Sequence, residues 1–95
     1  MFIVFLTFSD NKAAAPQFMD GHNAWIAEGF DAGVFLCTGS LRPAAGGVVI
    51  AHGESREALE ARLDADPFVV HDVVKTEIRE IAPGRTVPAL DFLTA

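Results

Sequence analysis

The apolar run Phe2–Phe8 (FIVFLTF) constrains the fold of this chain more than any other segment. It is rich in β-branched and aromatic residues and too short to form an independent helix, so it is expected to be a strand. Successive side chains of a strand point to opposite faces. Here both faces are apolar, since one carries Phe2, Val4, Leu6 and Phe8 and the other Ile3, Phe5 and Thr7. A sheet built on this strand must therefore be covered on both sides.

The remaining patterns place this strand in a β-α-β-β-α-β order. After Pro16, which can occupy the first turn of a helix, apolar residues recur at helical spacing over residues 17–30. Ser55 is a candidate N-cap for a second helix. The other expected elements are strands at 34–41, 47–52 and 73–81 and the second helix at 56–65. This order predicts an α+β, ferredoxin-like fold, in which one mainly antiparallel sheet carries both helices on the same face.

Two helices on one face leave the other face of the sheet open. The chain is expected to form one domain over residues 1–95, large enough for a single core but marginal in stability alone. A homodimer that packs sheet against sheet would bury the open apolar face and add stability. The tail over residues 85–95 contains several apolar side chains. We expect it to reach the partner or to seal an edge of the sheet.

Composition argues against several classes of partner. The net charge is −6 and there is no run of Lys or Arg, which makes nucleic acid and anionic membranes poor partners. Residues 1–8 lack the basic start and the cleavage site of a signal peptide, and no apolar run approaches the roughly 20 residues of a membrane helix. The single cysteine, Cys37, rules out an intrachain disulfide and fits a cytoplasmic protein.

His22 and Asp66 are the candidate functional pair. On a helical wheel His22 lies within an apolar stripe of residues 17–30, where a histidine alone is more often a hydrogen-bonded core residue. If Asp66 completes the helix over 56–65, its carboxylate also lies on an apolar stripe and needs a partner. Alternatively, Asp66 and Pro67 suit an N-cap and a first helical position, followed by only a short turn.

Three features together resemble the YCII-related family: a histidine in the first helix, the strand end Cys37-Thr38-Gly39-Ser40-Leu41, and the segment Asp64-Ala65-Asp66-Pro67-Phe68-Val69. The resemblance covers nearly the whole chain. It implies a dimeric α+β barrel of ferredoxin-like subunits, similar to muconolactone isomerases, and a candidate catalytic His–Asp pair that carries over to His22 and Asp66. Most members lack an assigned reaction. Two departures, Ser40 in place of a common proline and Asp72 in place of a common glycine, imply a pocket of altered shape and charge.

Three further residues are candidates for substrate binding. Ser40 could donate a hydrogen bond, and Phe68 is expected to line the same pocket. Arg42, at the junction of a strand and a loop, could bind an anionic substrate, although a solvated loop arginine would give the same pattern. No cofactor is expected, because the glycines at positions 46 and 47 precede a strand and not a helix. No metal site is expected, because no known ligand spacing joins His22, His52, His71 and Asp66.

Three functions fit these features. The first is a small dimeric acid–base enzyme, isomerase- or lyase-like, that acts on a small cyclic or aromatic metabolite through His22 and Asp66. The second is a non-catalytic module that binds a small molecule in the same pocket. The third is a structural or accessory domain in which the pair only satisfies its own hydrogen bonds. Loss of His22 separates the first from the second, since catalysis should collapse while binding largely survives.

Overall fold

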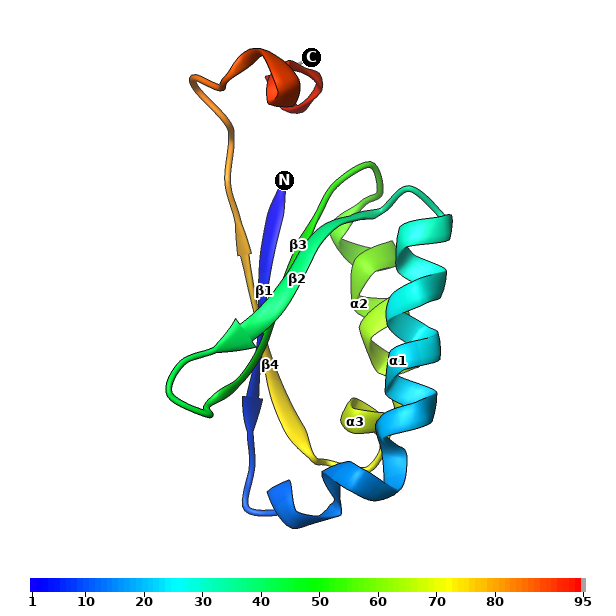
Figure 1. Ribbon diagram of the computed structural model, residues 1–95. Coiled ribbons are helices and arrows are strands. Elements are labelled where there is room, and N and C mark those ends of the chain that lie inside the picture. Colours follow the sequence, from blue (N-terminus) through cyan, green and yellow to red (C-terminus); the bar gives the residue numbers. More distant parts are fainter. Residues whose placement is uncertain (95) are drawn as a thin grey trace.

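The computed structural model describes residues 1–94 and shows a sheet with helices packed on one side (Figure 1). Over these residues the elements are β1 (Phe2–Phe8), the 3-10 turn η1 (Lys12–Ala14), α1 (Ala15–Asp31), β2 (Phe35–Leu41), β3 (Gly46–Ala51), α2 (Arg56–Asp64), α3 (Pro67–Val70), β4 (Val74–Glu80) and the 3-10 turn η2 (Pro88–Thr94). The expected strands and the two main helices are confirmed, with small shifts of their boundaries. The short helix α3 is an addition to the expected pattern.

The strands form one sheet in the order β2-β3-β1-β4, and every neighbouring pair is antiparallel. The strand β1 is central, so that Val4 lies opposite Val49 of β3 and Ile78 of β4. Figure 1 shows α1, α2 and α3 together on one face of this sheet. The α+β, ferredoxin-like arrangement predicted from the order of the elements is therefore confirmed.

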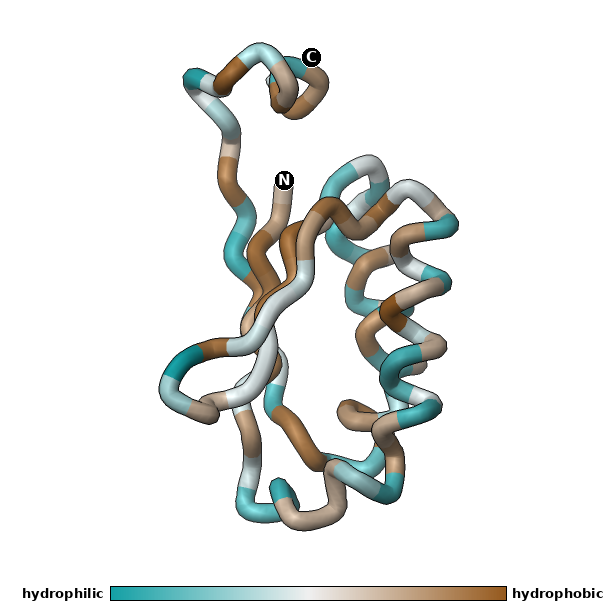
Figure 2. The backbone as a smooth tube through the Cα atoms, viewed as in Figure 1, coloured by the Kyte–Doolittle hydropathy of each residue, from teal (hydrophilic) through white to brown (hydrophobic). Residues whose placement is uncertain are grey.

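The core lies between the sheet and the helices. From β1 it receives Phe2, Val4 and Leu6, none of them more than 7% exposed, and from α2 it receives Leu59 and Leu63, neither more than 2% exposed. The alternation expected for β1 is thus real, because the helix face is buried while Ile3 and Phe5 on the other face are only half-buried. Figure 2 shows hydrophobic colours along much of the strands and more mixed colours along the helices.

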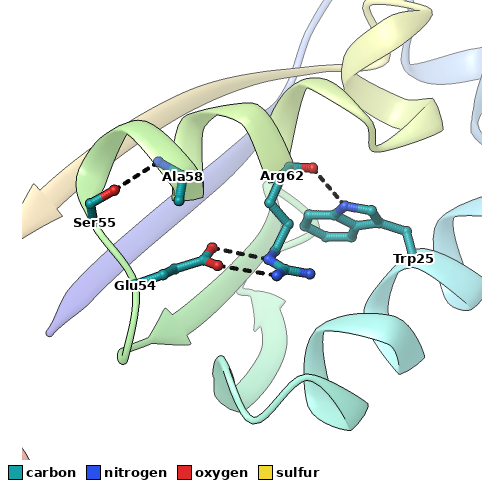
Figure 3. A network of polar contacts seen from close by, with 5 residues as sticks. All are labelled: Trp25, Glu54, Ser55, Ala58 and Arg62. Carbon is teal, nitrogen blue, oxygen red and sulfur yellow. Dashed lines mark hydrogen bonds and ion pairs between the residues drawn. The ribbon is translucent and has the colours of Figure 1, made fainter.

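The two main helices begin where the sequence predicts. Pro16 lies in the first turn of α1. The Ser55 hydroxyl oxygen accepts a hydrogen bond of 3.1 Å from the backbone N–H of Ala58, which satisfies one of the free donors at the start of α2. Figure 3 shows this cap beside the contacts made by Arg62.

The carboxyl end of α2 is fixed to α1 by a buried indole. Trp25 Nε1 donates a hydrogen bond of 2.8 Å to the backbone oxygen of Arg62, as Figure 3 shows. The Arg62 guanidinium forms two hydrogen bonds to Glu54, of 3.0 and 3.1 Å, and this pairing raises the pKa of Arg62. These contacts hold the end of α2 against α1, and so they also fix the position of the segment that follows α2.

Asp66 does not complete α2, which ends at Asp64. It has extended backbone angles (φ −67°, ψ 124°) and is the N-cap of α3. Pro67 explains this, since a proline disfavours helical angles at the residue before it and suits the first position of a new helix. The second of the two structures considered for this segment, a cap followed by a short turn, is the one adopted.

The face of the sheet opposite the helices is apolar and half-buried along β1 and β3, while β4 places the exposed charged side chains of Glu77 and Arg79 beside them on the same face. It carries Ile3 and Phe5 of β1 and Ile50 of β3. The tail after β4 extends away from the sheet past the end where the N-terminus lies (Figure 1), and its Val87 and Phe92 side chains are 61% and 47% exposed. Among the described residues, no helix has both the length and the apolar character needed to cross a bilayer.

Close packing of α1 on β2 depends on a glycine. A Cβ atom built on Gly29 would lie 2.1 Å from a ring carbon of Phe35. Replacing Gly29 with Ala gains about 1 kcal/mol of helix propensity but forces Phe35 out of a packed position, at a cost of up to about 3 kcal/mol. We therefore expect Gly29→Ala to lower the free energy of unfolding by about 1–2 kcal/mol, measured by urea titration.

Gly84→Ala provides the matched control, because a Cβ atom at Gly84 meets nothing within 4 Å. Its free energy of unfolding should change by less than about 0.5 kcal/mol. A Gly29→Ala protein as stable as the parent would contradict the packing described for α1 and β2.

Candidate active site

His22 and Asp66 come from different helices and meet on the buried side of α1. His22 Nδ1 lies 2.8 Å from Asp66 Oδ1. The Asp66 side chain is completely buried, and the His22 side chain is 12% exposed. The expected pairing of these two residues is therefore confirmed as geometry, and His22 faces the interior of the fold, as its place on the apolar stripe of residues 17–30 indicates.

Asp66 Oδ1 serves two donors at once. Besides His22 it accepts a hydrogen bond of 3.1 Å from the backbone N–H of Phe68, as an N-cap should. One oxygen atom of Asp66 therefore acts both as the cap of α3 and as the partner of His22. Within residues 1–94, Oδ2 of the same carboxyl group is buried and has no hydrogen-bond partner. The Asp66 carboxylate is therefore hydrogen-bonded both to His22 and to the backbone of α3, and it fixes the orientation of the His22 ring.

The imidazole ring is also held by aromatic contacts. Phe68 stacks on it with ring centroids 3.9 Å apart and planes 3° apart, and Trp25 lies beside it at 5.9 Å. The close approach of α3 to α1 is permitted by Gly21, where a Cβ atom would lie 3.0 Å from Pro67 Cγ. Glycine is a poor helix former, but Gly21 allows α3 to pack closely against α1 next to His22.

The hydrogen bond to Asp66 decides which nitrogen of His22 is available. An ionised carboxylate can only accept, so in the neutral imidazole Nδ1 carries the proton and Nε2 carries the lone pair. Among the described residues, none forms a hydrogen bond with Nε2. The pair thus presents one oriented nitrogen that can take up or release a proton.

His22 lines a cavity of about 300 Å³ between the helices and the sheet. Ser40 and Phe68 line it too, as the sequence predicts. Arg42 does not: it lies in the exposed β2–β3 turn, so its position gives no support to the predicted contact with a substrate. A polar side chain at the tip of a turn is solvated without any ligand, which is the other interpretation considered for this residue.

Two polar residues of the cavity were missed by sequence reasoning. Thr38 lies two residues before Ser40 on β2 and therefore on the same face of the strand. Asn23 follows His22 directly in α1. The alternation of β2 could have revealed Thr38. Nothing in the sequence indicated that Asn23 lines a cavity, because this residue lies off the apolar stripe of α1. The angle at which α1 crosses the sheet cannot be predicted from the spacing of apolar residues.

The second departure from the family pattern, Asp72, does not line the cavity. Its backbone has φ +55°, a left-handed conformation that glycine adopts most easily and that Asp tolerates better than most residues. This geometry explains why glycine suits the position. Of the two departures, only Ser40 alters the lining of the cavity.

The other two histidines lie apart from this pair. His71 stacks on Phe18 with ring centroids 3.9 Å apart, and His52 lies 5.0 Å from the ring of Phe92. Within residues 1–94, no group of three or more His, Cys, Asp or Glu side chains is arranged to hold a metal ion. An oriented imidazole such as that of His22 can transfer a proton.

The fold is similar to that of a solved enzyme. The 5-chloro-2-hydroxyhydroquinone dehydrochlorinase from Burkholderia phenoliruptrix AC1100, solved in complex with 2,5-dihydroxybenzoquinone, superposes with a TM-score of 0.73. The match covers 87% of this chain and 94% of that one, at 14% sequence identity. At this identity the likeness concerns the fold alone.

Family membership follows from the sequence itself. No curated protein matches the chain. The YCII-related domain matches residues 1–83, from the first residue of the chain to just beyond the end of β4. That range includes β1 to β4, all three α-helices and the His22–Asp66 pair. The chain therefore belongs to the YCII-related domain family.

Proposed function

We propose that this protein is a small acid–base enzyme that acts on a cyclic or aromatic molecule bound in the cavity beside His22. The single observation that carries this proposal is the contact of 2.8 Å between His22 Nδ1 and the fully buried Asp66 carboxylate. A carboxylate placed there orients the imidazole and stabilises its charged form, the role of the aspartate in histidine-based catalytic sites. Histidine is also the side chain best suited to exchange protons near neutral pH.

The proposed reaction is of the isomerase or lyase type. Nε2 of His22 removes a proton from a carbon next to a carbonyl group. In an isomerisation the imidazolium returns that proton to another atom of the same molecule, and in an elimination a leaving group departs from the neighbouring carbon with the electron pair. Asp66 stays ionised throughout and keeps the ring in place. The name of the structural neighbour, a dehydrochlorinase, describes a reaction of the second kind.

The cavity favours a small ligand. Its volume of about 300 Å³ lies at the lower end of the range for ligand sites, about 300–1,000 Å³. Phe68 and Ser40 would contact the ligand from the helix side and the sheet side. An open cavity beside the pair also supports binding over a purely structural role, so the second candidate is a non-catalytic module that binds the same class of molecule.

We also propose that the protein is a cytoplasmic homodimer. Ile3, Phe5 and Ile50 leave an apolar surface on the open face of the sheet, and a second copy offers the same surface in return. The exposed apolar side chains of the tail, such as Val87 and Phe92, would extend this interface. The exposed thiol of Cys37 suits a reducing compartment.

Removing the imidazole tests the catalytic proposal. We expect His22→Asn to lower the rate of proton transfer by about 10²–10⁴-fold, while the bound ligand keeps most of its other contacts. Asp66→Asn should lower the same rate, because the amide no longer supplies a negative charge beside the ring. The measurements are deuterium uptake from D2O by ring ketones and hydroxylated ring compounds, followed by NMR, and chloride release from 5-chloro-2-hydroxyhydroquinone.

His71→Asn and Asp64→Asn are the matched controls. His71 also stacks on a phenylalanine, but neither it nor Asp64 lines the cavity or belongs to the pair. Both should leave the rate unchanged. A His22→Asn protein that retains the rate of the parent would rule out acid–base catalysis by this residue. Binding without any proton transfer in the parent would favour the non-catalytic module.

A charge on the open face tests the dimer. We expect the parent protein to sediment as a dimer at micromolar concentration and Phe5→Asp to sediment as a monomer, because the interface would have to bury a carboxylate directly opposite Glu77 of β4. Val70→Asp is the control, since Val70 lies on α3, away from the open face, and is 58% exposed. It should remain dimeric. A monomeric parent would overturn the proposed assembly.

A further inference from the structure

We propose that the cavity beside His22 selects an uncharged, single-ring molecule that bears hydroxyl or carbonyl oxygens, and that Asn23, Thr38 and Ser40 hold these oxygens. The proposal rests on the proposed function, since it names the class of substrate for the same cavity. It also assigns a specificity-determining role to Asn23 and Thr38, for which sequence reasoning gave none.

The hydroxyls of Thr38 and Ser40 face the cavity because of the register of the sheet. Thr38 lies opposite Val49, which is buried on the helix face, and Ser40 lies opposite Gly47. Paired residues in an antiparallel sheet point to the same face, so both hydroxyls point toward α1. Gly47 has no side chain and therefore leaves room above this part of the sheet.

Apart from His22, the polar side chains that line the cavity are not engaged in hydrogen bonds within the described part of the protein. Within residues 1–94, the side chains of Asn23, Thr38 and Ser40 form no hydrogen bond to protein, and all three line the cavity. By contrast, the hydroxyls of Ser9 and Ser55 bond to the backbone. Two free hydroxyls on the sheet and one free amide on α1 can both donate and accept, which suits the oxygens of a hydroxylated or keto ring.

The charge of the lining sets the class of ligand. Among the described residues, none that lines the cavity is a Lys, Arg, Asp or Glu. Lys12 lies over the ring of Phe8 at 5.0 Å and contacts the backbone oxygen of Ala44. A carboxylate entering the cavity would lose its hydration and would meet no cation other than a charged His22 imidazole, which Asp66 already pairs. It would also approach the negative charge of Asp66 behind the imidazole.

The direct test compares two probes that differ in one group. Hydroquinone and 4-hydroxybenzoate share a hydroxylated ring, but the second carries a carboxylate. We expect hydroquinone to bind the full chain with a dissociation constant at least about tenfold lower, measured by ligand-detected NMR titration near neutral pH under argon. Equal or tighter binding of 4-hydroxybenzoate would overturn the charge selectivity and leave the proposed function intact. Failure of both probes to bind would overturn the proposed function and this inference together.

Variants test the residues. Thr38→Val and Ser40→Ala should each weaken hydroquinone binding by about three- to tenfold. Thr76→Val is the control, since Thr76 lies on β4 outside this cavity, and it should bind as the parent does. If both hydroxyl variants bind hydroquinone as tightly as the parent, the assignment of these hydroxyls is wrong.

Asn23→Lys tests the role of charge by a gain of function. Asn23 is exposed on α1, so a lysine there is compatible with the fold. The new ammonium group should shift the ratio of the two dissociation constants toward 4-hydroxybenzoate by about tenfold or more. Lys substitution at Ala24, the next residue on α1 and one that does not line the cavity, should leave the ratio unchanged. An unchanged ratio in Asn23→Lys would show that Asn23 does not reach the ligand.

Discussion

The contact between His22 and Asp66 is the interaction on which the rest of the site depends. A fully buried carboxylate is costly unless it is hydrogen-bonded, and Oδ1 of Asp66 meets this requirement through an imidazole on α1 and a backbone N–H on α3. The same two bonds therefore join the helices and direct His22. Trp25 supports the arrangement from the other side, because its indole fixes the end of α2 from which the chain proceeds to Asp66.

The site is divided between a tightly packed half and an open half. On the helix side, two stacked ring pairs join α1 to α3 and the residue that follows it. His22 of α1 stacks on Phe68, and Phe18 of α1 stacks on His71. On the sheet side, position 47 is a glycine and has no side chain, so the neighbouring hydroxyl groups of Thr38 and Ser40 stay uncovered. One half keeps the imidazole from moving, while the other leaves volume for a ligand.

Much of the fold could be predicted from sequence because the patterns are local. The alternation in Phe2–Phe8, the cap at Ser55 and the proline at Pro16 each fix one element. The pairing of His22 with Asp66 was also predictable, since a carboxylate beside apolar neighbours needs a partner. Asn23 could not be found in this way, because its place in the cavity depends on how α1 lies across the sheet. Arg42 does not line the cavity, and its contact with a substrate stays a prediction, because nearness to a strand end in sequence does not show where a turn residue lies.

We propose that Asp66 leaves Nε2 of His22 as the nitrogen that exchanges protons. Nitrogen-15 NMR of the imidazole rings tests this most directly. In its uncharged form His22 should be the Nδ1–H tautomer, with Nε2 unprotonated and a hydrogen-bonded Nδ1 proton, whereas His71, whose ring contact is the stack on Phe18, should favour no such fixed form. A His22 ring protonated at Nε2 would contradict the account, because the lone pair would then point at Asp66 and away from the ligand.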